Sequence, residues 1–340
     1  MKTYSEPIKK FSYTLPFLQN NAKKGYIFYM MNTKNNFFSL FSVRFVALLF
    51  LLLILTRAFY YWRSDGFSLI RISYVPEKTN NELAMPSLKK QKELSKICSH
   101  HFTYLGKGSQ AYAFISKDRQ YVLKLFKYYH LKPIPWMDSL PLFYPLNEVL
   151  NERLDRRYKK AAHTLNSYKI ANNLIPDECG LIFMQITPSE SFTLPVTITD
   201  KIKRTYQIDL SKHGFMLQKR VNLVLPTLEK WIKKGEIHKA KKFIRSLLEI
   251  IITRSLKGVQ DQDPDVYKNA GVFDTQAFFI DVGGFHINDH AKQQVVYAND
   301  IRKITLKLTQ WLKPRSPELV QFLDDEIASV TKQDNNYCLK

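Results

Sequence analysis

The chain has 340 residues, of which 45% are hydrophobic and 14% aromatic, enough to bury a core in one or two domains. A formal charge of +21 favours an anionic partner: a phosphorylated small molecule, an anionic membrane surface or nucleic acid. The sequence contains no nucleic-acid-binding motif. Its three cysteines lie far apart without a CxxC pair, which argues against a disulfide framework and a Cys-type zinc site.

An apolar run follows a basic N-terminal segment. Residues 1–42 are rich in Lys and Asn without a hydrophobic period, and are predicted to be disordered. The apolar run Phe45–Leu55 has eleven residues, which as a helix would cover about 16 Å of a hydrocarbon core of about 30 Å. Flanking arginines can snorkel and aromatic residues can anchor in the interface, so we predict one transmembrane helix over residues 43–62. The polar, turn-rich residues 63–96 predict a linker.

Two alternatives to a membrane anchor remain open. A cleaved signal peptide has an apolar run of this length, but residues 56–60 offer no small-x-small cleavage site. A buried helix of a soluble domain has a similar composition. Of the three, we favour one uncleaved transmembrane helix.

A glycine-rich hairpin opens the folded domain. Residues 101–105 and 113–116 are strand candidates, and the connection between them begins with Gly106, Lys107, Gly108 and Ser109. Because glycine lets the main chain approach closely, such a turn can lay its amides over a phosphate chain. Lys124 stands between two leucines in a third strand candidate, and a buried ammonium needs an anionic partner. The alternative is a Lys on the solvent face of an edge strand.

Leu105–Phe114 followed by Val122–Leu125 resembles the glycine loop and third-strand Lys of the protein-kinase-like superfamily. Ala111 departs from the family pattern, which has a third glycine there. The resemblance implies that Lys124 and the glycine loop (Gly106, Lys107, Gly108 and Ser109) bind the phosphates of ATP. It also implies an N-terminal lobe over residues 97–222, with an antiparallel sheet of about five strands and one helix.

The helix of that lobe is predicted from Asn147 to about Ala171. Glu148 and Glu152 are one turn apart on it, so both could face the sheet. The resemblance implies that one of them pairs with Lys124, as the family's helix Glu does. The alternative is that both are solvated and paired locally with arginines of the same helix.

The stretch Gly258–Phe285 concentrates polar residues: five carboxylates, one Asn and four Gly. Pro264, between two aspartates, disfavours a helix interior. Residues 277–280 form an apolar run that predicts a buried strand ending on Asp281-Val-Gly-Gly. A carboxylate at the end of an apolar strand is costly unless a cation meets it.

In the kinase-like superfamily this place carries the catalytic loop and the metal ligands. The resemblance implies that Asp281 and Asn269 hold Mg²⁺ and that Asp263 orients or deprotonates the acceptor hydroxyl, with Asp261 as the second candidate. Asn269 follows Asp263 by six residues where the family has five, and Gln262 stands where the family's His-Arg-Asp has Arg.

The C-terminal region, residues 223–340, is predicted to be a reduced helical lobe that includes the catalytic loop. Helices are expected at residues 226–232, 236–256, 299–312 and 316–331. This is too short for a full protein-kinase C-terminal lobe, and is similar to small atypical bacterial kinases of sugars, aminoglycosides or lipopolysaccharide. The predicted class is α+β: a two-lobe kinase-like domain behind one transmembrane helix.

The sequence therefore predicts a membrane-anchored kinase that uses ATP and Mg²⁺ to phosphorylate an unidentified hydroxyl acceptor, with a membrane-borne sugar as one candidate. Its expected partners are a nucleotide and an anionic membrane surface, and no nucleic acid. One alternative is a pseudokinase that acts as a tethered interaction module; another is a basic membrane protein whose motifs are coincidental. ATP use would place the domain in the cytoplasm, whereas the basic segment before the span favours a cytoplasmic N-terminus, so the orientation stays open.

Overall fold

The chain divides into two units, Met1–Arg63 and Ser64–Lys340. The computed structural model describes residues 43–73, 86–128, 144–189 and 192–332, so the predicted disordered segment lies outside the described residues. The helix Val43–Ser64 has 22 residues and is, by length and composition, apolar enough to cross a membrane. At about 1.5 Å per residue it reaches about 33 Å, against about 30 Å for a hydrocarbon core.

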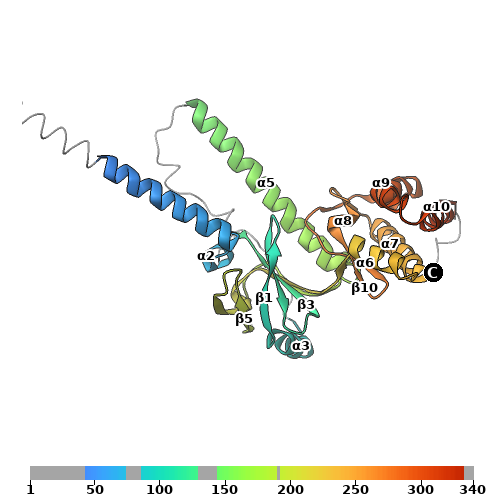
Figure 1. Ribbon diagram of the computed structural model, residues 1–340, viewed down its shortest axis with the longest axis horizontal. Helices are drawn as coiled ribbons and strands as arrows, with labels where there is room; N and C mark the ends of the chain where they lie inside the picture. Colours follow the sequence, from blue (N-terminus) through green and yellow to red (C-terminus); the bar gives the residue numbers. More distant parts are fainter. Residues whose placement is uncertain (1–42, 74–85, 129–143, 190–191, 333–340) are drawn as a thin grey trace, which may run out of the picture. The chain divides into compact units, whose positions relative to one another are not determined.

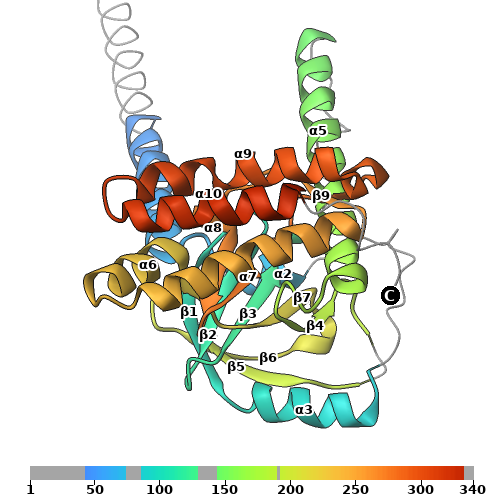
Figure 2. The same cartoon turned by 90° about the vertical axis from the view of Figure 1, so that its right-hand side faces the viewer.

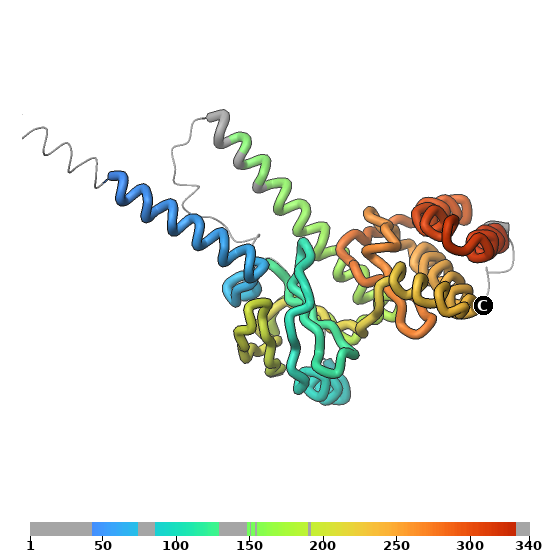
Figure 3. Tube along the Cα trace, in the orientation of Figure 1, coloured from blue at the N-terminus to red at the C-terminus, as the bar shows by residue number. Residues whose placement is uncertain are grey.

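A mixed sheet lies beside the helical region in the second unit (Figure 1), and the course of the chain through both can be followed in Figure 3. Its strand order is β4-β7-β3-β2-β1-β5-β6. The seven strands are β1 (His101–Lys107), β2 (Ala111–Ser116), β3 (Tyr121–Phe126), β4 (Leu181–Gln185), β5 (Pro195–Thr199), β6 (Thr205–Asp209) and β7 (Phe215–Lys219). We expected an antiparallel sheet of about five strands. Residues 195–209 instead contribute two strands, because the chain turns back near Lys203 (φ 69°) between β5 and β6, and β5 pairs with β1 in parallel.

Residues that pair across β1, β2, β3 and β7 share one face of the sheet. Gly106 pairs with Ala113, Ala113 with Lys124, and Lys124 with Met216. Because side chains alternate along a strand, the residues on either side of this row point to the opposite face. There Phe114, Leu123 and Leu217 are fully buried in an apolar cluster. The face with Lys124 is therefore the one available to a ligand.

The opposite face is covered by a segment that we expected to be a linker. Phe67 is 1% exposed and its ring lies 5.1 Å from that of Tyr112, and Ile72 in α2 (Leu69–Ser73) is also buried. Helix α3 (Leu88–Cys98) adds Leu94 to the same cluster. The linker prediction for residues 63–96 is thus wrong for 64–73 and 88–96, since burial of these apolar side chains fixes both parts on the sheet.

The rest of the unit is mainly helical (Figure 2). Its main helices are α5 (Tyr144–Leu174), α6 (Val224–Lys233), α7 (Ile237–Leu256), α9 (Gln294–Leu312) and α10 (Pro317–Lys332). Helix α7 buries an apolar stripe that includes Phe243, Leu247 and Ile251. Helices α9 and α10 lie side by side against α7, and Pro317 is the first residue of α10.

Short elements between α7 and α9 carry the polar stretch. These are β9 (Val259–Asp261), α8 (Val266–Asn269), β10 (Ala270–Phe273), β11 (Gln276–Phe279) and β12 (Phe285–Ile287), while β8 (Asn222–Leu223) lies earlier in the chain, directly before α6. Strand β10 pairs with both β8 and β11, and β9 pairs with β12. The segments around Asn269 and Asp281 lie next to each other at the end of the β10–β11 ladder. The Ile280 amide there donates a hydrogen bond to the Asn269 carbonyl at 2.8 Å. The described residues thus form a mixed α+β architecture.

Candidate active site

A cavity of about 920 Å³ lies between the sheet and the helical region. The strands contribute Leu105, Ala113, Val122, Lys124 and Met216, the connection Gly108–Ala111 covers one side, and α6 contributes Trp231. Five cationic and two acidic residues line it: Lys124, Lys219, Arg220, Lys230 and Lys268, with Asp274 and Asp281. The volume suits a cofactor-sized ligand, and the excess of cations suits an anionic one.

The glycine loop (residues 106–111) leaves room on the cavity face of the sheet. Gly106 pairs with Ala113, which lines the cavity, and a Cβ added at Gly106 would meet no atom within 4 Å. The amide of Gly108 is bonded to the Ala111 carbonyl at 2.9 Å, which closes the turn. Since no neighbouring side chain requires glycine at position 106, the open space is consistent with a ligand that approaches the backbone.

Lys107 does not point into this cavity, contrary to our expectation. The pairing of β1 with β2 shifts between Tyr104 and Gly106, which leaves Leu105 as an extra residue. A bulge of this kind switches the side-chain alternation, so Lys107 shares the outer face with Tyr104. Its Nζ lies 3.3 Å from the carboxylate of Asp65.

Lys124 faces the cavity from the middle of β3. Its Nζ donates a hydrogen bond to the carbonyl oxygen of Ile280, the residue before Asp281. Burial lowers the pKa of Lys124, and the nearby carboxylate of Asp281 partly offsets that shift. In the described part of the chain, no salt bridge joins Lys124 to a carboxylate. A phosphate group in the cavity would supply the anionic partner that a buried ammonium requires.

Neither Glu148 nor Glu152 supplies that partner, so this expectation needs correction. Glu152 pairs with Arg156 at 2.5 Å and its side chain is 59% exposed; Glu148 is exposed as well. The part of α5 that reaches the cavity is its C-terminal half, where Tyr168 lines the wall. Sixteen residues separate Tyr168 from Glu152, which is about 24 Å along a helix.

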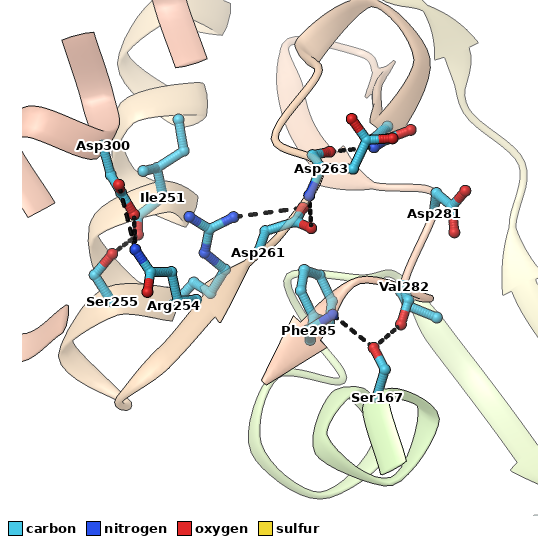
Figure 4. Close-up of polar contacts among 12 residues, drawn as sticks. Ser167, Ile251, Arg254, Ser255, Asp261, Asp263, Asp281, Val282, Phe285 and Asp300 are labelled. Carbon is cyan, nitrogen blue, oxygen red and sulfur yellow. Dashed lines mark hydrogen bonds and ion pairs between the residues drawn. The ribbon is translucent and has the colours of Figure 1, made fainter. Parts of the chain in front are cut away.

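Ser167, which the sequence analysis missed, fixes the segment that follows Asp281 (Figure 4). Its hydroxyl donates to the carbonyl of Val282 and accepts the amide of Phe285 at 2.7 Å. Ser167 is buried, as are its neighbours on the same helix face, Thr164 and Ala171. The signal that could have identified this contact is the recurrence of small and polar residues at helical spacing inside α5.

Asp263 lies in an exposed loop, and both its main-chain amide and its main-chain carbonyl form hydrogen bonds. Its amide donates to Oδ1 of Asp261 at 3.1 Å, and its carbonyl accepts Nδ2 of Asn269 at 2.6 Å. Among described residues its carboxylate has no hydrogen-bond or salt-bridge partner. The extra residue between Asp263 and Asn269 fits into α8, which Asp265 caps by accepting the amide of Tyr267. Asp263 and Asn269 are therefore in hydrogen-bond contact although Asn269 follows Asp263 by six residues and not five.

Asp261 is buried instead of facing an acceptor (Figure 4). Its side chain is 5% exposed and lies 3.8 Å from Arg254, whose side chain is 1% exposed. Burial raises the pKa of Asp261, while Arg254 opposes that shift. The second candidate for the catalytic base is thus better suited to hold the Asp263 amide. Arg254 itself follows Ile251 on the buried stripe of α7, a charged residue at an apolar position that the sequence analysis passed over.

Asp281 and Asn269 carry side-chain oxygens of the kind that Mg²⁺ takes together with a phosphate, but only Asp281 lines the cavity, and Asn269 lies outside its lining. Asp281 is exposed on the cavity wall, with Oδ1 accepting the Gly283 amide at 3.1 Å. The Nδ2 of Asn269 donates a hydrogen bond to the carbonyl of Asp263, so its Oδ1 is the atom that could bind a metal ion. No group of three His, Cys, Asp or Glu side chains that could hold a metal occurs in the described part. Mg²⁺ commonly takes one or two carboxylates plus substrate phosphates and water, so the residues present fit it.

No family model matches the chain, and comparison with curated proteins also gives no match. Among solved structures it is similar to a high-resolution crystal structure of WbdD, at 16% identity and a TM-score of 0.31 over 67% of this chain and 44% of that one. It is also similar to WbdD with a kinase inhibitor, at 15% identity and a TM-score of 0.30 over 67% and 45% of the two chains. A third structure, of the bifunctional kinase-methyltransferase WbdD, is similar at 16% identity and a TM-score of 0.31, over 66% of this chain and 43% of that one.

The chain spans less than half the length of the WbdD chains that it matches. At TM-scores near 0.3 this similarity is too distant to support an argument about the activity of this chain or the role of any individual residue.

Proposed function

We propose that the protein is a membrane-anchored phosphotransferase that moves the γ-phosphoryl group of ATP to a hydroxyl acceptor. One observation carries the proposal: Lys124 and Asp281 lie on the walls of one cavity, below a glycine loop with open space on the ligand side. The Lys124 ammonium and the Asp281 carboxylate do not form a salt bridge with each other in the described part of the chain. The ammonium can therefore bind a phosphate and the carboxylate a magnesium ion, which are the two charges that a magnesium–phosphate pair needs.

Each residue has a distinct part in this reaction. Lys124 binds a phosphate oxygen and holds it in position, while Asp281 and Asn269 would hold Mg²⁺. When bound, Mg²⁺ neutralises the charge of the phosphate chain. The acceptor oxygen attacks the γ-phosphorus, the bond to the β-phosphate oxygen breaks, and Asp263 takes the acceptor proton. Positioning and charge neutralisation supply most of the rate in such a reaction.

The charge of the cavity lining supports a proposal about the class of acceptor. Lys219, Arg220, Lys230 and Lys268 line it in addition to Lys124. These cations exceed what one nucleotide phosphate chain needs, which favours an acceptor that carries negative charge near its hydroxyl. The apolar helix Val43–Ser64 would hold the domain at a membrane, so a membrane-borne anionic sugar is the acceptor that we infer.

The direct test is phosphoryl transfer by the purified full chain. The protein in detergent would be incubated with radiolabelled ATP, Mg²⁺ and a glycolipid fraction, and labelled lipid would be separated and counted. We expect transfer by the wild type and a loss of about 10²-fold or more in Asp281→Asn, since its metal-holding charge is gone. A wild type that leaves both ATP and lipid unchanged would contradict an active enzyme.

A pseudokinase is the second candidate, and one contact favours it. The Lys124 ammonium is bonded to a main-chain carbonyl, with no acidic partner on α5. A site of this kind can bind nucleotide without aligning it for transfer. ATP binding without any labelled product would support this candidate over an enzyme.

A further inference from the structure

The chain leaves the apolar helix through a sharp turn at Asp65 and Gly66. Both residues have positive φ, 52° and 71°, and Asp and Gly are among the residues that tolerate this region best. The amide of Phe67 donates to the Ser64 carbonyl at 3.0 Å, which closes the turn. Phe67 then enters the apolar cluster on the outer face of the sheet.

Asp65 contacts the strand that leads into the glycine loop. Its carboxylate accepts a hydrogen bond from the Tyr104 hydroxyl at 3.0 Å and lies 3.3 Å from Nζ of Lys107, both on β1. Lys201, from the turn between β5 and β6, reaches the same carboxylate at 3.0 Å. Partial burial works against ionisation, yet the hydrogen bonds from Lys201, Tyr104 and Lys107 hold the pKa of Asp65 below its ordinary value.

The neighbouring residues fix the other side of the loop. The Gly66 carbonyl accepts the Tyr112 hydroxyl of β2 at 2.7 Å, so the turn binds both strands of the hairpin. Lys127, placed over the Tyr112 ring at 4.2 Å, donates to the Gly108 carbonyl at 2.6 Å. The glycine loop is thus held from its outer face at Lys107 and from β3 at Gly108.

We propose that Asp65 is a positioning residue for the nucleotide site: the turn that follows the apolar helix holds the glycine loop over the cavity. The inference rests on the proposed function, because the loop has a ligand to position only if the cavity binds a nucleotide. The bulge at Leu105 places Gly106 on the cavity face and Lys107 on the outer face of the sheet, where the Asp65 carboxylate binds Lys107. Release of Lys107 would let the loop move away from the phosphates.

The contacts also define the route by which a change in the turn at Asp65 and Gly66 can reach the glycine loop. A displacement of the turn reaches the loop through two hydrogen-bonded strands, β1 by Tyr104 and β2 by Tyr112. A substitution at Asp65 is therefore expected to change nucleotide affinity through these contacts.

The test compares full-length variants in detergent. Asp65→Ala removes the contacts to Lys107 and Tyr104, and Asp65→Glu keeps the charge as the conservative rescue. Asp118→Ala is the matched control: Asp118 accepts bonds from Ser116 and Gln120 in the turn between β2 and β3, on the same sheet but at the other end of β2. The readouts are the Kd of Mg²⁺-ATP, the melting temperature, and the hydrogen exchange of the amides of residues 105–111.

We expect Asp65→Ala to raise the Kd about tenfold, equivalent to about 1.4 kcal/mol, and to speed exchange in the loop. Asp65→Glu should recover part of both changes. The control should lower the melting temperature without either change, which separates positioning from sheet stability. An unchanged Kd in Asp65→Ala, beside normal binding by the wild type, would overturn the inference and leave the proposed function intact. A wild type that binds no nucleotide would overturn both.

Discussion

The ammonium of Lys124 donates a hydrogen bond to the carbonyl oxygen of Ile280, which ties the third strand of the sheet to the residue before Asp281. This bond joins the two halves of the proposed site without the helix carboxylate that the sequence motif led us to expect. It holds the ammonium close to the Asp281 carboxylate, whose charge favours the protonated form of Lys124. A phosphate bound between them would meet both charges in place.

Asp263 and Asp261 should respond to substitution in opposite ways. Asp263 is exposed, so Asp263→Ala should fold normally and lose phosphoryl transfer, by about 10²-fold or more if it takes the acceptor proton. Asp261 lies against buried Arg254, so Asp261→Ala should cost about 3 kcal/mol in the free energy of unfolding. Urea unfolding and transfer assays on both variants check this. A stable Asp261→Ala protein with normal transfer would disprove the structural role.

Lys127 should make stability depend on pH in the alkaline range. Burial is the main cause that lowers its pKa to about 8, from an ordinary value of 10.5. Below pH 8 both folded and unfolded states carry the proton, and the cost of burying the charge is fully present. Between pH 8 and 10.5 the unfolded state binds more protons, so the free energy of unfolding rises with pH.

The measurement is urea unfolding at pH 7 and pH 9.5 for wild type and Lys127→Met. Taking the difference between the two proteins removes the titration of other groups. We expect the wild type to gain relative to the variant as pH rises. A constant difference would mean that Lys127 has an ordinary pKa in the folded protein.

Gly271 in β10 has no room for a side chain. A Cβ at this position would lie 2.1 Å from Cγ2 of Val221, in the segment that joins β7 to α6 and lines the cavity. Gly271→Ala should therefore lower stability by about 1–3 kcal/mol and weaken nucleotide binding as Val221 is displaced. Gly106→Ala, which meets no atom within 4 Å, is the matched variant and should keep its melting temperature. Calorimetry on the pair distinguishes the two glycines.

Helix α5 carries a cationic stripe suited to an anionic membrane surface. Arg153, Arg156, Arg157 and Lys160 recur at helical spacing and are exposed. Near anionic lipid each such residue contributes about 1 kcal/mol. Full-length protein in nanodiscs containing phosphatidylglycerol should show slower amide exchange at residues 151–162 than in zwitterionic nanodiscs. Replacing all four residues with Gln should abolish the difference; equal exchange in both lipids for the wild type would contradict membrane contact.

Local patterns were sufficient to predict the elements on which the site is built. The hairpin around Gly106 and the amphipathic α7 are each set by residues close in sequence, so alternation and helical period identify them. The apolar strand that ends near Asp281 follows in the same way. For Lys124 the local pattern also allowed the solvent face of an edge strand, and the position of β3 between β7 and β2 excludes that alternative. Asn269 also joins Asp263 despite the unexpected spacing, because the extra residue fits into a single capped turn.

Other features depend on contacts distant in sequence and could not be derived from local pattern. Helix α5 has 31 residues, and only packing decides that the turn with Ser167, and not the one with Glu152, reaches the cavity. Lys107 changes face through one extra residue in β1, which alternation alone does not reveal. Residues 64–66 are polar and turn-forming, yet Phe67 next to them packs against the rings of Tyr112 in β2 and Tyr206 in β6, contacts that the local pattern does not reveal.

The central claim is that the cavity binds Mg²⁺-ATP through Lys124, and a thermal shift tests it most directly. The melting temperature of the full chain in detergent would be measured with and without Mg²⁺-ATP for wild type and Lys124→Ala. At about 100 times its Kd a ligand stabilises the folded state by about 2.7 kcal/mol, an easily measured shift. We predict a Mg²⁺-dependent rise for the wild type that Lys124→Ala loses. No rise for the wild type, or an equal rise for both proteins, would contradict the account.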